Sequence, residues 1–503
     1  MAQTQASVLP AMLNKEKIPN QSSIIKNASF LFIAHLAGRI LSFIITIILP
    51  RYFEGGFDDL GKLFYALWLT NLLSVITELG MHTPLIREVA ICKSEATKMI
   101  SNALIIRLIL SIITLLILIV LSTFVYSGVL SVLILVIGLS ETINSIAQLF
   151  RCIFRSFENM EFEALGVIIE RGIVFLTGLG LTLLGYGVIT FGTVILFASI
   201  VNLIVTTIIM WVRFSKIDLK LISLDLCFNL LRQSLPYALS GILYMAYFRI
   251  DGIMLKNMMG NSGDIAMGWY GTGYSFVNAL TIIPGAFMGA VFPVMSRAFS
   301  SSAEKMQSIY TRSMKLMLII AIPMALFTTF LADNIVRLLY SSSRFGTQDH
   351  QAIGIILKIL IWSGALLFFN TVIITVFRSA DKRRAFIVLT TLSLLVNFIS
   401  NLILIPKYSY IGTSISMVIS ESIFFIFGIY YVRRYISRIS DFRVIIKSLF
   451  ASIFLLICMI SWKYVDLINK NIHPILIVCI SIVIYFSLLL GLGIIRRDDI
   501  SMS

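Results

Sequence analysis

Long apolar stretches, separated by short polar connections, repeat along nearly the whole chain. Fourteen of these stretches approach the roughly 20 residues that a helix needs to cross the hydrocarbon core of a bilayer. Each stretch is therefore predicted to be a membrane-spanning helix. The predicted spans are residues 30–49, 60–79, 103–124, 130–152, 164–185, 189–212, 234–257, 268–296, 312–332, 353–378, 385–406, 410–432, 444–465 and 473–495.

Composition excludes the other protein classes. A chain of 503 residues would fill about three soluble domains of about 150 residues each. Here 58% of the residues are hydrophobic and only 13% are charged, about half the share of an ordinary globular domain. These charges are too few to cover the surface of a soluble protein, and the chain is too apolar to be disordered. The predicted fold class is an all-α polytopic membrane protein.

Basic residues outnumber acidic ones by 40 to 25, which in a soluble protein would suggest a nucleic-acid partner. In a membrane protein, lysines and arginines instead mark cytoplasmic connections. With the N-terminus inside, 27 of the 40 lie at or beside inner connections, 8 at outer ones and 5 within spans. We therefore expect both termini in the cytoplasm and no nucleic-acid partner. The first span is too long for a signal-peptide core, and the outer connections leave no room for a soluble catalytic domain.

Two parts of the chain share the same spacing of arginine and glycine residues. Arg39 is followed 22 positions later by Gly61, and Arg249 is followed 22 positions later by Gly271, with a further arginine 48 positions on in both cases. This pattern suggests two parallel six-helix halves, an arrangement found in transporters with the substrate site between the halves; chance similarity is the alternative. The predicted parts are a cytoplasmic tail (1–29), an N-lobe (30–212), a cytoplasmic linker (213–233), a C-lobe (234–432), and two further helices with a tail (433–503).

Charged residues inside the spans are the main candidates for function. A charge at mid-membrane costs about 2.5–3.5 kcal/mol on insertion scales, so it should face protein or a wet cavity. His35 and Arg39 lie one helical turn apart on one face, next to Gly38, which would let a neighbouring helix approach. Arg249 and Asp251 are two positions apart and should point to different faces.

Two arginines, one from each half, would bind an anion if they faced one cavity. Arginine keeps its charge and grips phosphate with two donors. The alternative is that each arginine neutralises a carboxylate and holds helices together. The available carboxylates are those of Asp251, Glu78, Glu141 and Glu170.

The fourth span carries a polar stripe that runs from mid-membrane to the cytoplasmic side. It is either a cavity wall that meets sugar hydroxyls or a set of hydrogen bonds between helices. The pair Glu170–Arg171, and Glu421 in the twelfth span, are interpreted as structural. The stripe consists of Glu141, Asn144, Ser145, Gln148, Arg151 and Arg155.

The eighth span contains Pro284 and Gly285. Proline removes a backbone hydrogen bond and bends a helix, so these residues are predicted to form either a hinge or a static kink. No phosphate-binding loop of the type G-x-x-x-x-G-K-[ST] is present, which excludes direct use of ATP. The four histidines and five cysteines are scattered singly, so no metal site and no cofactor are expected.

Two blocks of sequence resemble a known family, the Wzx-type flippases of polysaccharide biosynthesis, which belong to the multidrug/oligosaccharidyl-lipid/polysaccharide (MOP) exporter superfamily. The resemblance covers about residues 27–462 in order and spacing and is strongest in these blocks. The first block contains Gly38-Arg39-Ile-Leu-Ser-Phe43, Leu60-Gly-Lys-Leu-Phe-Tyr65, Glu78-Leu-Gly-Met81 and Arg87-Glu-Val-Ala90, and the second contains Phe248-Arg-Ile-Asp-Gly-Ile-Met-Leu255 and Phe292-Pro-Val-Met-Ser-Arg297.

The resemblance implies two six-helix lobes around a central cavity, working by alternating access in a prokaryotic plasma membrane. It implies a substrate made of an oligosaccharide on a polyprenyl phosphate or pyrophosphate, carried from the cytoplasmic to the outer leaflet. Membrane lipids and the polymerase and assembly proteins of cell-surface polysaccharides are the expected partners. Fourteen spans match the related lipid II flippases, whereas many Wzx proteins are assigned twelve. The cavity must open sideways, because the prenyl tail stays in lipid.

Taken together, the residues and the resemblance give one expected site. Arg39, with His35 beside it, and Arg249 would attract the phosphate, while Glu141, Asn144 and Gln148 would bind sugar hydroxyls. Aromatic side chains such as Tyr274 would stack on sugar rings. A gradient of H⁺ or Na⁺ would drive the cycle through Asp251, Glu141 or Glu421. The alternatives are a multidrug antiporter of the same superfamily and a membrane polysaccharide polymerase or lipid-dependent glycosyltransferase.

Overall fold

The computed structural model describes residues 21–341, 343–435, 485 and 487, and within them every regular element is a helix. Eleven helices of this part are long and apolar enough to cross a membrane. A short π-helical segment, Val174–Gly178, joins α6 to α7. The α-helices are α1 (Gln21–Tyr52), α2 (Phe57–Glu78), α3 (His82–Ile91), α4 (Ala96–Phe124), α5 (Gly128–Ser156), α6 (Met160–Ile173), α7 (Leu179–Leu183), α8 (Val188–Arg213), α9 (Leu224–Met258), α10 (Gly263–Leu280), α11 (Ile282–Ser301), α12 (Ala303–Leu339), α13 (Thr347–Ser379) and α14 (Arg383–Tyr435).

The predicted all-helical membrane fold is confirmed, and each of the first twelve predicted spans falls on helical residues. The spans 385–406 and 410–432 together form α14, which is interrupted by a non-helical residue, Ser409 (φ 51°). Beyond it, a Cβ on Gly412 would overlap the carbonyl oxygen of Leu404, because the chain turns back there. The spans 444–465 and 473–495 lie outside the described residues, so the count of fourteen stays a prediction.

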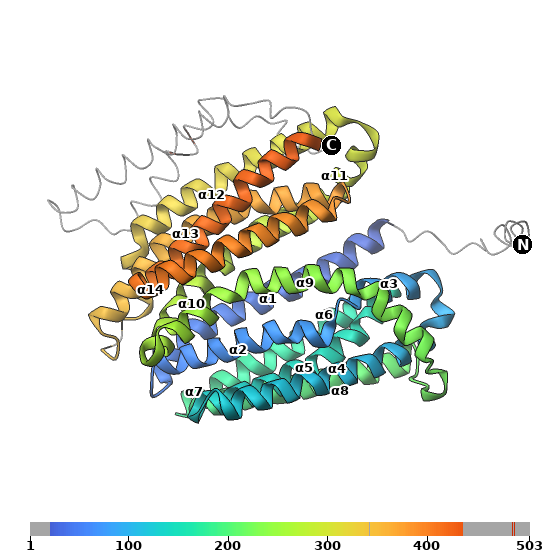
Figure 1. Cartoon of the computed structure of the whole chain (residues 1–503), viewed down its shortest axis with the longest axis horizontal. Helices are drawn as coiled ribbons and strands as arrows, with labels where there is room; N and C mark the ends of the chain where they lie inside the picture. Colours follow the sequence, from blue (N-terminus) through green and yellow to red (C-terminus); the bar gives the residue numbers. More distant parts are fainter. Residues whose placement is uncertain (1–20, 342, 436–484, 486, 488–503) are drawn as a thin grey trace, which may run out of the picture.

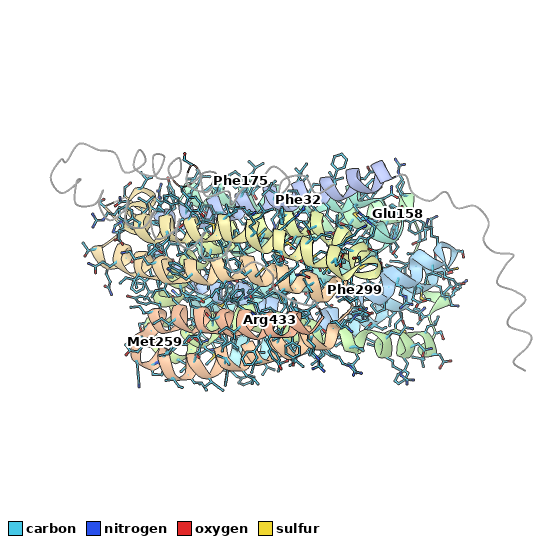
Figure 2. All side chains as sticks on the ribbon, turned by 90° about the horizontal axis from the view of Figure 1, so that it is seen from above. Phe32, Glu158, Phe175, Met259, Phe299 and Arg433 are labelled. Carbon is cyan, nitrogen blue, oxygen red and sulfur yellow. The ribbon has the colours of Figure 1, made fainter. Side chains whose placement is uncertain are left out.

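The helices run along the long axis of the molecule, and their connections gather at its two ends (Figure 1). Glu158, in the α5–α6 connection, and Met259, in the α9–α10 connection, lie near opposite ends (Figure 2). We call these the α5–α6 end and the α9–α10 end. Since alternate connections emerge on opposite sides, this arrangement is the one that repeated membrane crossing requires.

The outward faces of several helices are apolar. On α4, Ile109, Ile112 and Leu116 are each more than half exposed, whereas Arg107 on the opposite face is fully buried. The Nη1 of Arg107 donates to the carbonyl oxygen of Thr77 in α2 at 3.0 Å. Polar groups thus face protein and apolar groups face outward, which is the distribution expected in lipid.

We call α1–α8 the N-lobe and α9–α14 the C-lobe, and the seam between them is closed most tightly where α2 packs against α10. A Cβ on Gly61 would overlap the backbone of Asp264, and a Cβ on Gly268 would overlap the backbone of Phe57. These glycines therefore let the two backbones approach more closely than any other residue would. Gly61 and Phe57 begin α2, so this contact lies toward the α9–α10 end.

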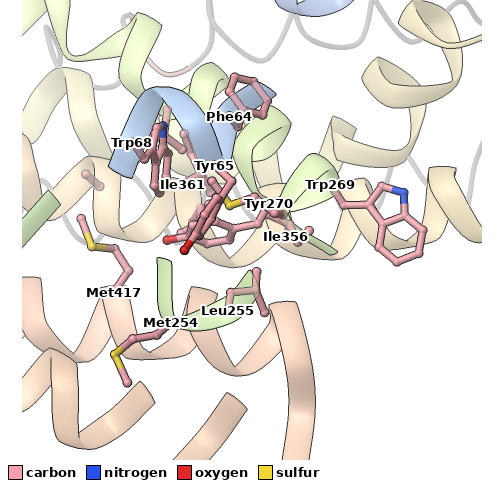
Figure 3. Packing of buried hydrophobic residues seen from close by; sticks show 14 of the residues in the cluster. Phe64, Tyr65, Trp68, Met254, Leu255, Trp269, Tyr270, Ile356, Ile361 and Met417 are labelled. Carbon is pink, nitrogen blue, oxygen red and sulfur yellow. The ribbon is translucent and has the colours of Figure 1, made fainter. Parts of the chain in front are cut away.

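Aromatic and aliphatic side chains from both lobes share one core at the seam. Tyr65 and Trp68 of α2 lie among Met254 of α9, Tyr270 of α10 and Ile361 of α13 (Figure 3), and all five are at least 90% buried. The ring of Trp68 meets that of Tyr270 edge-on at 6.1 Å. This shared core holds the lobes together and leaves room for a cavity beside it, within the N-lobe.

Candidate functional site

A cavity with a volume of about 710 Å³ is enclosed mainly by α1, α2, α5, α6 and α8. The C-lobe contributes only Met245 of α9 and Ser275, Asn278 and Ala279 of α10. The volume is within the ~300–1,000 Å³ range of ligand pockets. The cavity is therefore a chamber of the N-lobe that the C-lobe covers on one side.

The wall changes from apolar to polar along the cavity. Toward the α9–α10 end it is formed by Leu49, Leu60 and Phe191, all at least 96% buried. Toward the α5–α6 end it is formed by polar residues that include His35 and Arg155. His35 is an exposed residue, and the Arg155 side chain is 40% exposed, so the polar end reaches the surface while the apolar end is sealed.

Ion pairs neutralise part of the polar wall. Arg155 donates to both carboxylate oxygens of Glu163, with its Nε 2.7 Å from Oε2. Arg151 pairs with Glu170 at 3.4 Å, and Asn202 donates to the same carboxylate at 2.9 Å. These contacts tie the end of α5 to α6 and α8. The predicted alternative, in which polar residues of the stripe hold helices together, thus holds for Arg151 and Arg155.

Four charged side chains of the wall make no hydrogen bond or ion pair with the described part of the chain: Arg39, Arg171, Glu78 and Glu141. Arg39 and Arg171 are both exposed, although each lies in the middle of a membrane-spanning helix. Exposure of a mid-membrane arginine is tolerable only beside water or a ligand. These two guanidinium groups are thus free to bind an anion.

A glycine places Arg171 at the wall. A Cβ on Gly38 would lie 3.1 Å from the Cγ of Arg171, so the absence of a side chain at residue 38 lets α6 approach α1. The predicted close approach of a neighbouring helix at Gly38 is confirmed. Arg171 was interpreted as structural, and its position on the cavity wall was not predicted. The sequence feature that could have indicated this position is that Arg171 is a second mid-span arginine in the same lobe.

His82 lines the polar end of the cavity between α2 and α4. Burial, together with the charges of Arg107 and Arg155, lowers the pKa of His82 to about 3. Since this pKa is far below neutral, the imidazole is uncharged at physiological pH. His82 therefore adds hydrogen-bonding capacity to the wall but no charge.

Several predicted site residues do line the cavity, and others do not. Arg39, His35, Glu141, Asn144 and Gln148 lie on its wall. In the structure Asn144 donates to Glu170 at 3.4 Å, whereas Gln148 has no side-chain partner in the described part. Their role in binding substrate stays a prediction.

Arg249 is not among the residues that line the cavity, so the structure does not bring it to one wall with Arg39. Its Nε donates to the side-chain oxygen of Asn71 in α2 at 3.3 Å, and its guanidinium lies 5.1 Å from the Trp68 ring. Asn71 itself lines the cavity. Arg249 therefore extends across the seam to the side of Asn71 that faces away from the cavity. It is held there by the cation–π contact with Trp68 and the hydrogen bond to the Asn71 side chain. Tyr274 packs edge-on against the same indole at 5.1 Å.

Asp251 is only 1% exposed and belongs to a second polar cluster inside the C-lobe. It accepts hydrogen bonds from the Tyr270 hydroxyl at 3.0 Å and from Asn401 at 3.4 Å. Close by, Glu421 accepts from Tyr247 at 2.7 Å and from Asn370 at 2.6 Å. As predicted, Asp251 and Arg249 do not pair. Neither carboxylate has a cation within ion-pair distance in the described part of the chain.

We expect Tyr270→Phe to lower stability by about 1–2 kcal/mol, because it removes a donor from the buried carboxylate of Asp251. The measurement is the thermal unfolding midpoint of the purified protein in detergent. Tyr244→Phe is the matched control, since the Tyr244 side chain is 39% exposed and its hydroxyl has no partner in the described chain. Equal midpoints for the two variants would contradict this account of Asp251.

Two helices meet just before the proline, at the place where a bend is predicted. Helix α10 ends at Leu280 and α11 starts at Ile282. Pro284 has no N–H to donate to the carbonyl of Leu280. The amide of Gly285, by contrast, still donates to Thr281 at 3.2 Å. Whether the break acts as a hinge stays a prediction.

A helical bundle with many membrane-spanning helices, two lobes and a polar chamber sealed at one end is the architecture of a membrane transporter. The sequence profile described as "Polysaccharide biosynthesis protein" matches residues 24–299, which is more than half of the chain. The chain belongs to this family, and the predicted resemblance is confirmed. The profile described as "Lipid II flippase MurJ" matches residues 274–486. No curated protein gives a significant match.

Solved structures of the superfamily share the fold. The lipid II flippase MurJ in an inward closed conformation superposes with a TM-score of 0.73 at 17% identity, over 93% of this chain and 100% of that chain. An outward-facing multidrug resistance MATE transporter of the MOP superfamily gives 0.58 at 17% identity, over 82% and 95%. A MOP transporter from Pyrococcus furiosus gives 0.56 at 17% identity, over 82% and 96%. The protein is therefore a multi-pass membrane flippase or transporter.

Proposed function

We propose that the protein moves an oligosaccharide linked to a polyprenyl phosphate or pyrophosphate from the cytoplasmic to the outer leaflet of a prokaryotic plasma membrane. The observation that carries this proposal is the presence of two guanidinium groups, those of Arg39 and Arg171, on the wall of a cavity of about 710 Å³. Neither group has a hydrogen-bond or ion-pair partner among the described residues. Guanidinium groups bind phosphate with paired, charge-assisted hydrogen bonds. The remaining polar wall would receive the sugars, and the prenyl tail would stay in lipid.

The cycle is proposed to be alternating access. The charge bias of the sequence supports a cytoplasmic α5–α6 end, and on that assignment the structure is open toward the cytoplasm and sealed toward the outside. Substrate would enter at the polar end, the lobes would rock about the seam, and the contact between α2 and α10 would open. The break ahead of Pro284 in the α10–α11 span supports a hinge.

An ion gradient would drive the cycle. Asp251 and Glu421 are buried carboxylates with neutral hydrogen-bond partners, and Glu141 lies on the cavity wall. We propose these three groups as carriers of H⁺ or Na⁺. Enzymes that polymerise the exported glycan are the proposed protein partners.

A multidrug antiporter is the second candidate, since MATE transporters share the fold. Four arginines and four glutamates line the cavity, whereas a site for lipophilic cations favours a net acidic wall. The free arginines favour the flippase. A polymerase is less well supported, because the connections between the described helices are short.

The test uses purified protein in liposomes that carry a fluorescent short-chain prenyl diphosphate sugar in both leaflets. Movement of the probe is followed as the fraction that a membrane-impermeant reductant can quench. We expect the protein to speed translocation at least ten-fold over empty liposomes. Uptake of a lipophilic cation such as ethidium, without movement of the prenyl sugar, would instead establish the antiporter.

A further inference from the structure

Glu141 differs from the other carboxylates of the cavity. It lies in the middle of α5, halfway along the membrane-spanning part, and its side chain lines the cavity. It is half-buried and accepts no hydrogen bond from the described part of the chain. A carboxylate at this depth is costly unless water or a ligand meets it.

The neighbouring carboxylate at the same depth, Glu170, differs from Glu141 because it accepts hydrogen bonds from side chains of the protein. Glu170 receives donors from Asn144, Arg151 and Asn202. Those three donors are therefore engaged and do not serve Glu141. Arg171 lies on the same cavity wall but forms no ion pair with Glu141 in the described part of the chain. The acceptor capacity of Glu141 is thus directed into the chamber.

The cavity consequently offers two kinds of free group. As far as the described residues go, Arg39 and Arg171 are free donors for an anion, and Glu141 is a free acceptor for hydroxyl, amide or ammonium donors. A substrate with a phosphate at one end and an uncharged or amino sugar at the other would satisfy both. A sugar that bears its own carboxylate would face Glu141 as a like charge, which costs several kcal/mol in a desolvated site.

We propose that Glu141 is a specificity-determining residue that selects the type of sugar next to the lipid phosphate. It accepts neutral and amino sugars and excludes sugar acids such as uronic acids. This inference rests on the proposed function, since it assumes that a lipid-linked sugar occupies the chamber. It adds the chemical class of that sugar, which neither the family nor the fold specifies.

The test compares two probes, farnesyl diphosphate linked to N-acetylglucosamine and farnesyl diphosphate linked to glucuronic acid. Binding of each to the purified full-length protein in detergent is measured by microscale thermophoresis. We expect the wild type to bind the N-acetylglucosamine probe at least ten-fold more tightly. Glu141→Gln keeps the shape but removes the charge, and it should bring the two affinities to within about two-fold, mainly by improving binding of the glucuronic acid probe.

Asp225→Asn is the matched control, because Asp225 is exposed at the start of α9, away from the cavity. It removes the same charge and should leave the ten-fold ratio unchanged. Equal binding of both probes by the wild type would overturn the role of Glu141 and leave the proposed function standing. A ratio that persists in Glu141→Gln would overturn it as well. Failure of the wild type to bind either probe would count against the proposed function itself.

Discussion

Arg39→Ala is expected to abolish transport, with binding of a prenyl diphosphate weakened about 100-fold. The substitution removes a free guanidinium at mid-membrane, and truncation of a charged anchor in a desolvated site costs several kcal/mol. The folded state should survive, because the Arg39 side chain makes no hydrogen bond or ion pair with the described chain and lies exposed on the cavity wall. Arg39→Lys should keep part of the activity, since an ammonium retains the charge but loses paired donation.

Arg171→Ala tests whether the second guanidinium takes part, and a loss of at least ten-fold is expected. Arg213→Ala is the control, because Arg213 is exposed at the end of α8 and outside the cavity. Transport in liposomes and affinity for farnesyl diphosphate are the two measurements, with the thermal midpoint as a check of folding. If Arg39→Ala and Arg213→Ala both transport at the wild-type rate, the anion site does not lie at Arg39.

The helical fold could be predicted from hydropathy because few backbone conformations are stable in lipid. Backbone groups inside a bilayer must bond within their own segment, so an apolar run of about 20 residues becomes a helix. The break at Ser409 was predictable in the same way, since 385–432 is too long for one crossing. The signals were lengths and polarity, which are local properties of the sequence.

The site was predicted less completely, because side-chain partners depend on which helices pack together. Arg39 was recognisable as a mid-span charge, and it lines the cavity. Arg249 carries the same signal, but α9 packs against α2, and the indole of Trp68 and the amide of Asn71 hold it at the seam. No spacing rule distinguishes these two arginines.

The repeated arginine–glycine spacing of the sequence corresponds to a helix contact at the seam. Gly61 and Gly271 are each 22 positions after the arginine of their half, and both lie in the contact between α2 and α10. A Cβ on Gly271 would overlap the ring of Phe64 in α2. The two glycines that the spacing pairs thus lie in one contact between helices. The spacing was visible in the sequence, but the contact between the two glycine-bearing faces required the fold.

Gly61→Ala is expected to prevent closure at the α9–α10 end and to reduce transport at least 30-fold. A methyl group at this position overlaps the backbone carbonyl of Asp264, and backbone cannot swing aside as a flexible side chain can. The overlap must therefore separate α2 from α10. A cost of about 2–3 kcal/mol on the closed state is ordinary for overpacking, and it shifts the ratio of closed to open molecules by about 30- to 150-fold.

The opening is measured as a distance between nitroxide labels at Glu54 and Asn261, two exposed residues on the N-lobe and C-lobe sides of that end, with the five native cysteines replaced. We expect the Gly61→Ala distribution to move to longer distances. Gly289→Ala in α11 is the control, because a Cβ there meets no atom within 4 Å and alanine favours the helix. Since α2 and α10 also share the aromatic core around Trp68, a partial opening that pivots on this core is expected. An unchanged distance in Gly61→Ala with normal transport would show that the glycine contact does not seal the chamber.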